Sequence, residues 1–241
     1  MGLTRKKNNF KLSGDSIFHT IQGEGNWAGK PCTFIRLHFC NLACSFCDTF
    51  YTWHPESEEY YTESSDIHID QIKPAIIKAQ QEKGLTKTIK HVVFTGGEPL
   101  IQQQLIVQWM QNNPEWIVQI ETNGTIMPAK YLLKYAKFNC SPKLQNAHNT
   151  AKTIFPEILQ AISRSTDPCF KFVCSSTSDI DEVLSQFSCL QRSDVWIMPE
   201  GVIFAENKQI IDVILDTVIS SGINFTLRQQ NILFDGAKRG V

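Results

Sequence analysis

Phe39-Cys40-Asn41-Leu42-Ala43-Cys44-Ser45-Phe46-Cys47-Asp48-Thr49 is the stretch around which the rest of the sequence is arranged. Its three cysteines have the spacing C-x3-C-x2-C and follow an apolar run, 31–39, that is typical of a strand. Three thiolates this close in sequence can meet at one metal site, and soft sulfur ligands favour zinc, copper(I) or an iron–sulfur cluster. A structural zinc usually has four protein ligands. A four-iron cluster bound by only three cysteines keeps one iron open for a small molecule.

The spacing alone leaves other interpretations open. Zinc could take a histidine as its fourth ligand, and His38 and His54 are the nearest candidates. Alternatively, the three cysteines could be buried structural residues. A second motif, Thr95-Gly96-Gly97-Glu98-Pro99, directly follows another apolar run over 91–94, so both motifs come immediately after a strand pattern.

Strand and helix patterns alternate along the chain. Apolar runs predict strands over 31–39, 91–94, 116–120, 138–140, 169–174, 195–198 and 224–227, and helices over 69–83, 100–111, 128–136, 155–163, 180–187 and 207–220. Such alternation implies parallel β/α units, whose ligands bind at the carboxyl ends of the strands. The motif residues follow strands directly. We therefore expect an α/β fold with one shared site, in a single domain over 1–241 whose residues 1–13 are loosely ordered.

Two further features precede the cysteine loop. Gln22-Gly23-Glu24-Gly25 places a carboxylate between two glycines, which allows a ligand to approach the backbone closely or simply makes a tight turn. By itself this pattern more often means a plain turn. Arg36 interrupts the strand predicted over 31–39, and because an unpaired buried charge is costly, the pattern alone favours the solvent face for its side chain.

Composition excludes several classes of protein. The net charge is −1 over 241 residues, with acidic and basic residues mixed, so we expect neither a nucleic-acid-binding surface nor a membrane-attracted face. No apolar run reaches the roughly 18 residues of a membrane span, and the N-terminus lacks the apolar core of a secretory signal. The remaining cysteines are scattered, and we expect them to be ordinary reduced residues in the cytoplasm. They are Cys32, Cys140, Cys169, Cys174 and Cys189.

Together, the cysteine motif and the Gly-Gly-Glu-Pro motif resemble the radical S-adenosylmethionine (SAM) superfamily, and the whole chain resembles its 7-carboxy-7-deazaguanine synthase family. The likeness extends over 18–25, 34–37, 40–53, 92–99, 120–125 and 141–144. It implies a modified partial (β/α) barrel and a homodimer. The reaction it implies is a lyase reaction that converts 6-carboxy-5,6,7,8-tetrahydropterin to 7-carboxy-7-deazaguanine with loss of ammonia, in queuosine biosynthesis. It also implies a [4Fe-4S] cluster, SAM and Mg²⁺ as cofactors, and an electron donor such as flavodoxin.

The resemblance also assigns roles to single residues. It places the cluster on Cys40, Cys44 and Cys47, and Mg²⁺ on Thr49. It places SAM on Phe46, Cys47, Asp48, Gly97, Ser141, Pro142 and Lys143. It places the substrate on Ile21, Gln22, Gly23, Glu24, Arg36, Thr95 and Pro199. Here Arg36 would point inward, where its planar fork can bind the substrate carboxylate in a bidentate pair. Glu24 would accept hydrogen bonds from the aminopyrimidine edge.

The C-terminal part departs from the family pattern. Relatives often carry a Gln-Thr-His-Lys-like stretch where this chain has Arg228-Gln229-Gln230-Asn231, and a Leu-Gln-Pro-like stretch where it has Met198-Pro199-Glu200. Two alternatives also stand beside the favoured function. One is another small radical SAM enzyme, such as a glycyl-radical activase, which shares both motifs but does not explain 22–25, Arg36 and 47–49 together. The other is a zinc-stabilised binding module.

Overall fold

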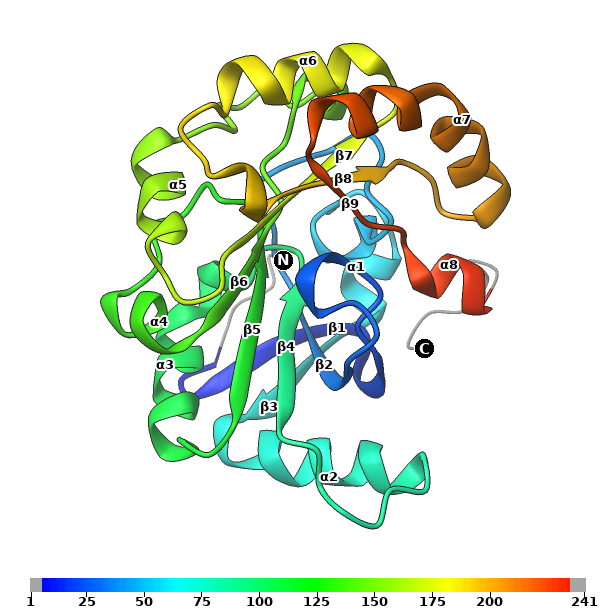
Figure 1. Cartoon of the computed structure of the whole chain (residues 1–241). Helices are drawn as coiled ribbons and strands as arrows, with labels where there is room; N and C mark the ends of the chain where they lie inside the picture. Colours follow the sequence, from blue (N-terminus) through cyan, green and yellow to red (C-terminus); the bar gives the residue numbers. More distant parts are fainter. Residues whose placement is uncertain (1–5, 235–241) are drawn as a thin grey trace.

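One curved sheet with helices along its outer side makes up residues 6–234, the part of the chain that the computed structural model describes (Figure 1). Its nine strands lie in the order β3-β1-β2-β4-β5-β6-β7-β8-β9. β1 runs antiparallel to β2 and β3, and each neighbouring pair from β2 to β9 is parallel. The strands are β1 (Asn9–Ile21), β2 (Pro31–Leu37), β3 (Ser64–His68), β4 (His91–Gly96), β5 (Ile117–Thr122), β6 (Lys137–Cys140), β7 (Cys169–Cys174), β8 (Val195–Pro199) and β9 (Asn224–Phe225).

Helices connect the parallel strands as the alternating sequence pattern predicts. The connecting helices are α2 (Ile72–Glu82), α3 (Gln103–Asn112), α4 (Lys130–Tyr135), α5 (Pro156–Ser163), α6 (Thr177–Gln186) and α7 (Phe204–Ser221). Two short helices lie outside this scheme, α1 (Glu59–Thr62) before β3 and α8 (Gln229–Phe234) after β9. In the described residues β3 and β9 are the two edges of the sheet, so the barrel is open. This confirms the expected α/β fold of partial-barrel type.

A continuous apolar core joins the helices to the sheet. Trp109 of α3, for example, is buried with its ring 5.7 Å from that of Phe94 in β4 and 5.9 Å from that of Trp116. Buried aromatic pairs of this kind give large apolar contact area and a defined geometry. The strands are thereby fixed from outside, and their carboxyl ends form a rigid rim on which side chains can be positioned.

β1 is the main difference from the sequence-based expectation. Residues 9–13 belong to this strand and Phe10 and Leu12 are buried, so the prediction of a loosely ordered segment over 1–13 is wrong there, while residues 1–5 lie outside the described residues. The register against β2 shifts between Leu12 and Ile17, next to Gly14 with a φ of 59°. A bulge of this kind breaks the alternation by which strands are recognised. β3 was missed for another reason, since it is a short polar edge strand.

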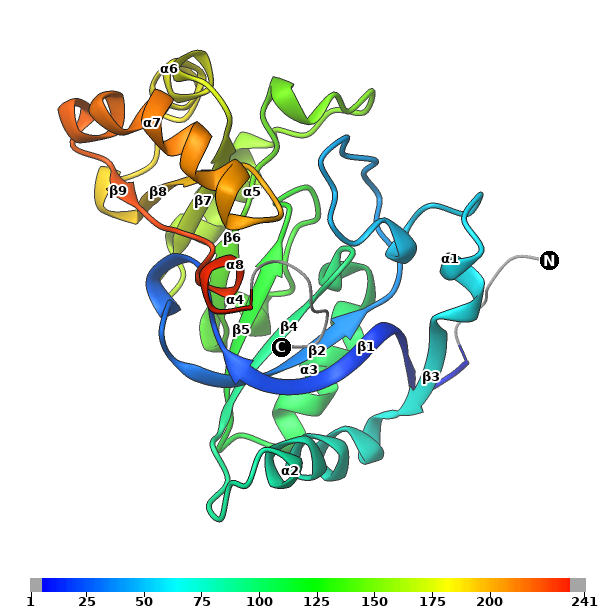
Figure 2. The same ribbon diagram turned by 90° about the vertical axis from the view of Figure 1, so that its right-hand side faces the viewer.

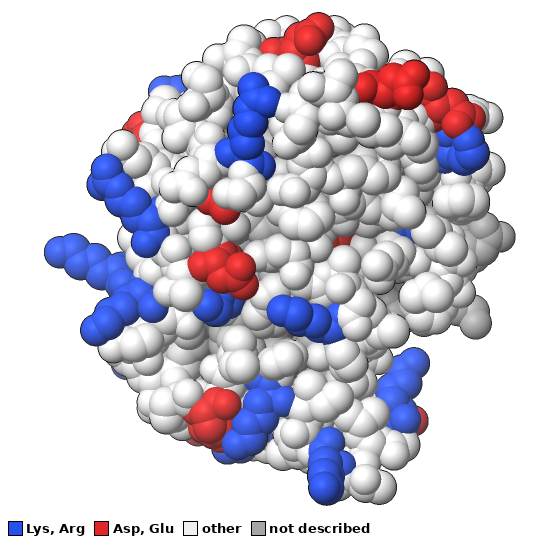
Figure 3. Space-filling view, viewed as in Figure 1, with Lys and Arg blue, Asp and Glu red and all other residues white. Residues whose placement is uncertain are grey.

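Two observations bear on the surface. Within residues 6–234, no helix is long and apolar enough to cross a membrane. On the face seen in Figure 3, acidic and basic side chains are scattered among uncharged ones rather than gathered into one field. That face agrees with the mixed, nearly neutral composition of the chain.

Candidate functional site

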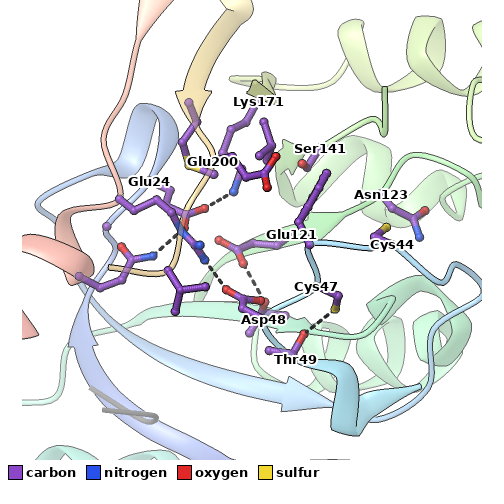
Figure 4. A pocket seen from close by; sticks show the side chains of 18 of the residues that line it. Glu24, Cys44, Cys47, Asp48, Thr49, Glu121, Asn123, Ser141, Lys171 and Glu200 are labelled. Carbon is purple, nitrogen blue, oxygen red and sulfur yellow. Dashed lines mark hydrogen bonds and ion pairs between the residues drawn. The ribbon is translucent and has the colours of Figure 1, made fainter. Parts of the chain in front are cut away.

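A cavity of about 990 Å³ lies at the carboxyl ends of the parallel strands. In Figure 4, Cys44 and Cys47 lie on one side of it, Glu24 and Lys171 lie on the other, and Asp48 and Glu121 lie between. It brings together nearly all the site residues predicted from the sequence. Those that line it are Ile21, Gln22, Gly23, Glu24, Arg36, Cys40, Cys44, Phe46, Cys47, Asp48, Thr49, Thr95, Gly97, Ser141, Lys143 and Pro199.

Pro142 is the one predicted residue that does not line the cavity, and its side chain is buried. Its neighbours Ser141 and Lys143 both line it, and the Ser141 amide still donates to the Thr122 carbonyl at 2.7 Å, which continues the pairing of β6 with β5. Successive side chains of extended backbone point to opposite sides. The alternation therefore turns Ser141 and Lys143 to the cavity and Pro142 to the protein interior.

Each of the three cysteine sulfurs has an N–H donor that lies outside the C-x3-C-x2-C motif. Asn123 Nδ2 lies 3.9 Å from Cys40 Sγ, Asn149 Nδ2 lies 3.2 Å from Cys44 Sγ, and Trp53 Nε1 lies 3.2 Å from Cys47 Sγ. Hydrogen bonds to sulfur are one of the ways in which a protein tunes a bound iron–sulfur cluster. The motif spacing gave no sign of these three donors.

The arrangement of donors does not suit a single zinc ion. Within residues 6–234, no three His, Cys, Asp or Glu side chains come close enough together to hold one metal ion. His38, a suggested fourth ligand, is buried with its Nδ1 3.1 Å from Ser13 Oγ, and neither it nor His54 lines the cavity. A structural zinc needs four ligands around one ion. In a cluster each cysteine binds a different iron, so the three sulfurs need not surround one ion.

The Gly-Gly-Glu-Pro motif packs directly against the start of the cysteine loop. The amide of Gly97 donates to Leu37 O at 3.0 Å and that of Glu98 to Phe39 O at 2.8 Å. A Cβ on Gly97 would lie 2.0 Å from Phe39 O, and one on Gly96 would lie 2.0 Å from Leu37 O. Only glycine permits so close a contact between backbones. The two motifs therefore occur together because one supports the other.

Glu98 acts from behind the cavity rather than inside it. Its carboxylate is fully buried and accepts from Leu100 N at 2.9 Å, Thr122 Oγ1 at 2.9 Å and Asn123 N at 2.7 Å. Burial raises the pKa of Glu98 and outweighs these hydrogen bonds, which act to lower it. The carboxylate ties the end of β4 to the end of β5, and so it holds Asn123 beside Cys40.

On the opposite side of the cavity, Glu24 is surrounded by donors. It forms a buried ion pair with Lys171 of β7 and accepts from Arg228 Nε at 3.1 Å and Gln230 Nε2 at 2.6 Å. Burial alone would raise the pKa of this carboxyl, but the Lys171 ammonium and Arg228 guanidinium hold it far below its usual range. Glu24 is therefore a charged acceptor in a largely dry environment.

The divergent stretch 228–231 packs on the Gln22–Gly25 turn, where the C-terminal segment meets the blue loop after β1 in Figure 2. Gln229 N donates to Gly23 O at 3.0 Å, and a Cβ on Gly23 would lie 1.8 Å from Gln230 Oε1. Arg228 also forms an ion pair with Asp48 of the cysteine loop. One side chain thus connects the two ends of the cavity.

Between the two ends lies a group of polar side chains centred on Glu121. It accepts from Thr95 Oγ1 at 2.7 Å and from Gln22 Nε2 at 3.0 Å. Arg36 lines the same cavity, with its guanidinium 5.6 Å from the Phe18 ring centroid. The solvent-facing position that its strand pattern favours is therefore wrong. Lys171 was not selected from the sequence, although it is a single charged residue within an apolar strand, as Arg36 is.

Comparison with known proteins identifies the family. Residues 34–168 match the family model of the radical SAM superfamily. The chain is 30% identical over 228 residues to a 7-carboxy-7-deazaguanine synthase of Pyrobaculum aerophilum, and the match covers 92% of this chain and 94% of the relative. This chain is a radical SAM protein of the 7-carboxy-7-deazaguanine synthase family.

Other comparisons agree with this assignment. A 7-carboxy-7-deazaguanine synthase of Rickettsia prowazekii is 43% identical over 134 residues, which span 56% of this chain and 52% of the relative. One of Clostridium acetobutylicum is 29% identical and covers 93% of this chain and 96% of the relative. The structure of QueE from Escherichia coli matches with a TM-score of 0.64 at 23% identity, over 91% of this chain and 93% of that one. That likeness shows the shared fold.

As a radical SAM protein of the 7-carboxy-7-deazaguanine synthase family, the chain uses a [4Fe-4S] cluster and SAM. The donor set fits the cluster, because three partly exposed free thiols face one cavity and each has an N–H partner. Burial raises the pKa of the Cys40 thiol to about 12, so the thiol is protonated without metal, and metal binding has to displace that proton. The family name also decides against the zinc-stabilised module and favours the synthase over other small radical SAM enzymes.

Proposed function

We propose that this protein catalyses the conversion of 6-carboxy-5,6,7,8-tetrahydropterin to 7-carboxy-7-deazaguanine with loss of ammonia, on the route to queuosine. The observation that carries the proposal is the single cavity at the strand ends. It gathers three thiols on one side, a buried carboxylate on the other and the Arg36 guanidinium in the same space. Its volume of about 990 Å³ is at the upper end of ligand-binding pockets, which suits two ligands held side by side.

At one end of the cavity we assign Cys40, Cys44 and Cys47 to the cluster. The residues assigned to SAM are Phe46, Cys47, Asp48, Gly97, Ser141, Pro142 and Lys143. When bound, the cluster supplies the electron that cleaves SAM and so starts radical chemistry on the substrate. Lys143 is preorganised for an anionic group, because its ammonium donates to Ser141 O and Oγ, both at 2.8 Å, and lies beside the cavity. Pro142 contributes backbone only, since its ring is turned away.

The opposite end of the cavity is assigned to the pterin. We assign Ile21, Gln22, Gly23, Glu24, Arg36, Thr95 and Pro199 to it, and all of them line the cavity. Arg36 can hold the substrate carboxylate in a bidentate pair. Glu24, kept ionised by two cations, accepts from the pyrimidine edge of the ring.

Mg²⁺ is assigned to Thr49. Its hydroxyl lies 3.6 Å from Cys47 Sγ, at the border between the cysteines and the rest of the cavity. Magnesium prefers six oxygen ligands and keeps several waters. A hydroxyl alone cannot hold it, so the substrate carboxylate is the natural second ligand.

We further propose that the active form is a homodimer of single-domain subunits in the cytoplasm, reduced by a donor such as flavodoxin. The family resemblance supports the dimer and the donor, and the partly exposed cysteines support access by a protein that delivers one electron at a time. Sedimentation of the cluster-loaded protein tests the dimer directly, since a monomer over the whole concentration range would exclude it.

The decisive experiment is an anaerobic assay of the cluster-loaded protein. The protein is mixed with SAM, a reductant and 6-carboxytetrahydropterin, and 7-carboxy-7-deazaguanine and ammonia are measured together with methionine. Product is expected only when all three components are present. If SAM is cleaved but no deazaguanine forms, the radical SAM assignment stands and the substrate assignment fails.

A further inference from the structure

Arg228 occupies the centre of the cavity's contact network, although no motif points to it. Its side chain is 17% exposed and bonds with all three of its nitrogens. Nε donates to Glu24 Oε1 at 3.1 Å, Nη1 donates to Gly201 O at 2.9 Å, and Nη2 donates to Asp48. The guanidinium is thus fixed in orientation from three directions while it lines the cavity.

Fixing the guanidinium in this way leaves donors to spare. A guanidinium carries five N–H groups, and three are used within the described residues, so each Nη retains one. Glu24 retains acceptor capacity as well, since a carboxylate has about four lone-pair sites and Lys171, Arg228 and Gln230 take three. Arg228, as a donor, and Glu24, as an acceptor, therefore lie side by side at one end of the cavity.

This pair is complementary to one edge of a pterin. A 2-amino-4-oxopyrimidine ring presents a carbonyl oxygen next to a ring N–H, and such an edge binds a donor next to an acceptor. We propose that Arg228 is a specificity-determining residue that donates to the 4-oxo group of the substrate while Glu24 accepts from the adjacent N3–H. The proposal rests on the pterin substrate of the proposed function. It gives the C-terminal segment a role in recognition as well as in packing on the Gln22–Gly25 turn.

The physical consequence is selectivity at ring position 4. A ring with an amino group there turns N–H donors toward the guanidinium, and both sides then lack an acceptor. Buried groups left unpaired carry the full cost of desolvation, so a site built on hydrogen bonds rejects such analogues strongly. Arg228 is held by two carboxylates and a carbonyl, so it cannot easily turn to accommodate the analogue.

The test uses two stable ligands that differ at this position, pterin-6-carboxylate and 2,4-diaminopteridine-6-carboxylate. Their dissociation constants are measured by calorimetry with the cluster-loaded protein and SAM at about pH 6.5, where N3 of the oxo ligand carries its proton. The wild type is expected to prefer the oxo ligand, and Arg228→Met to lose about tenfold or more of that preference, mainly through weaker binding of the oxo ligand. Arg228→Met also takes one donor from Glu24, so Lys171→Met, which takes another donor from Glu24 and keeps Arg228, is measured beside it and should lose less of the preference. Arg192→Met, which removes an exposed arginine outside the cavity, is the matched control and should keep the wild-type ratio.

Because the ratio is measured within one protein, a general loosening of the site lowers both affinities and leaves it unchanged. An unchanged ratio in Arg228→Met, or tighter binding of the oxo ligand, would overturn the proposal. If Arg228→Met does not fold, Arg228→Gln is judged by the same ratio, which should fall because a glutamine amide can turn either its donor or its acceptor to ring position 4. If the wild type itself binds neither pteridine and forms no deazaguanine, the proposed function fails as well. If the wild type forms product but the ratio is unchanged in the Arg228 variant, only the role of Arg228 is refuted, and the proposed function stands.

Discussion

Cys44 offers the sharpest test at the scale of single residues. Its sulfur faces the cavity and accepts a hydrogen bond from Asn149 Nδ2. Of the cysteines in the described residues, only those of the motif line that cavity. Cys44→Ala should lose most of its iron and form no 5′-deoxyadenosine when reduced with SAM. Cys189→Ala removes an exposed cysteine and should retain both properties. Full iron loading and SAM cleavage by Cys44→Ala would rule out the three-cysteine cluster.

Arg36 is expected to carry much of the substrate affinity. Removing a bidentate partner of a carboxylate in a partly desolvated site costs on the order of 2–5 kcal/mol. Arg36→Ala should therefore bind the pterin carboxylate far more weakly, while its iron content and its affinity for SAM stay as in the wild type. Calorimetry gives the affinity and iron analysis gives the control. Unaltered affinity would mean that Arg36 lines the cavity without contacting the substrate.

Thr49 should link metal binding to substrate binding. Because one neutral hydroxyl is a poor magnesium site, the metal should bind weakly to the substrate-free protein and detectably when the pterin carboxylate is present. Thr49→Ala should lower product formation more than it lowers SAM affinity. Metal titration with and without substrate measures the linkage. Tight magnesium binding to the substrate-free enzyme, or full turnover after complete chelation, would show that the assignment is wrong.

Lys171 should contribute stability through its buried pair with Glu24. Breaking such a pair leaves a buried carboxylate short of a partner, so Lys171→Met should lower the free energy of unfolding by on the order of 3 kcal/mol at pH 7. The folded-state pKa of Glu24 lies below its ordinary value of 4.5. Its contribution is therefore complete above that value and is lost as the pH falls below it.

Urea unfolding of the cluster-free protein at pH 7 and pH 4 measures this effect. The difference between wild type and Lys171→Met should shrink at the lower pH, and the double variant Lys171→Met/Glu24→Gln should recover part of the loss. A difference of the same size at both pH values, without recovery, would mean that Lys171 stabilises by packing alone.

At the scale of elements, the contact between β4 and the cysteine loop is decisive. A methyl group at Gly97 would lie 2.0 Å from Phe39 O. Gly97→Ala must therefore push the loop away, at a cost of about 1–3 kcal/mol, and iron content should fall although every cysteine is present. Gly84→Ala is a demanding control, because its added methyl group meets open space although its φ of 81° is unsuited to alanine. Equal iron content in the two variants would contradict this account.

Elements with clean periodicity were predictable from the sequence, and those defined by distant partners were not. The strands from β4 to β8 and helices α2 to α7 lie within a few residues of their predicted positions, because apolar side chains recur at the right spacing. β1 was not predicted because its bulge interrupts the alternation of apolar and polar residues. β3 was not predicted because a polar edge strand forms through pairing with its neighbour and has no apolar pattern of its own. α8 is a single short turn of mixed residues whose place is set by contacts with the Gln22–Gly25 turn.

At the scale of the whole molecule, the same division holds for the site. Cysteine spacing and strand endings pointed to residues that now line one cavity, but Arg228, Lys171 and Glu121 required the assembled sheet. Arg228 lies 204 residues from Glu24 and 180 residues from Asp48. Pairing over such distances leaves no periodic trace in the sequence, which is why the role of Arg228 could not be inferred from it.

The 204-residue separation of Glu24 and Arg228 also matters while the protein is being made. At about 5–20 residues per second, a ribosome adds Arg228 roughly 10–40 s after Glu24. The cysteine motif and all the strands of the described residues are translated before the C-terminal segment that packs on the Gln22–Gly25 turn. A nascent chain that stalls before residue 228 thus carries every proposed cluster ligand without the arginine that joins the two halves of its pocket.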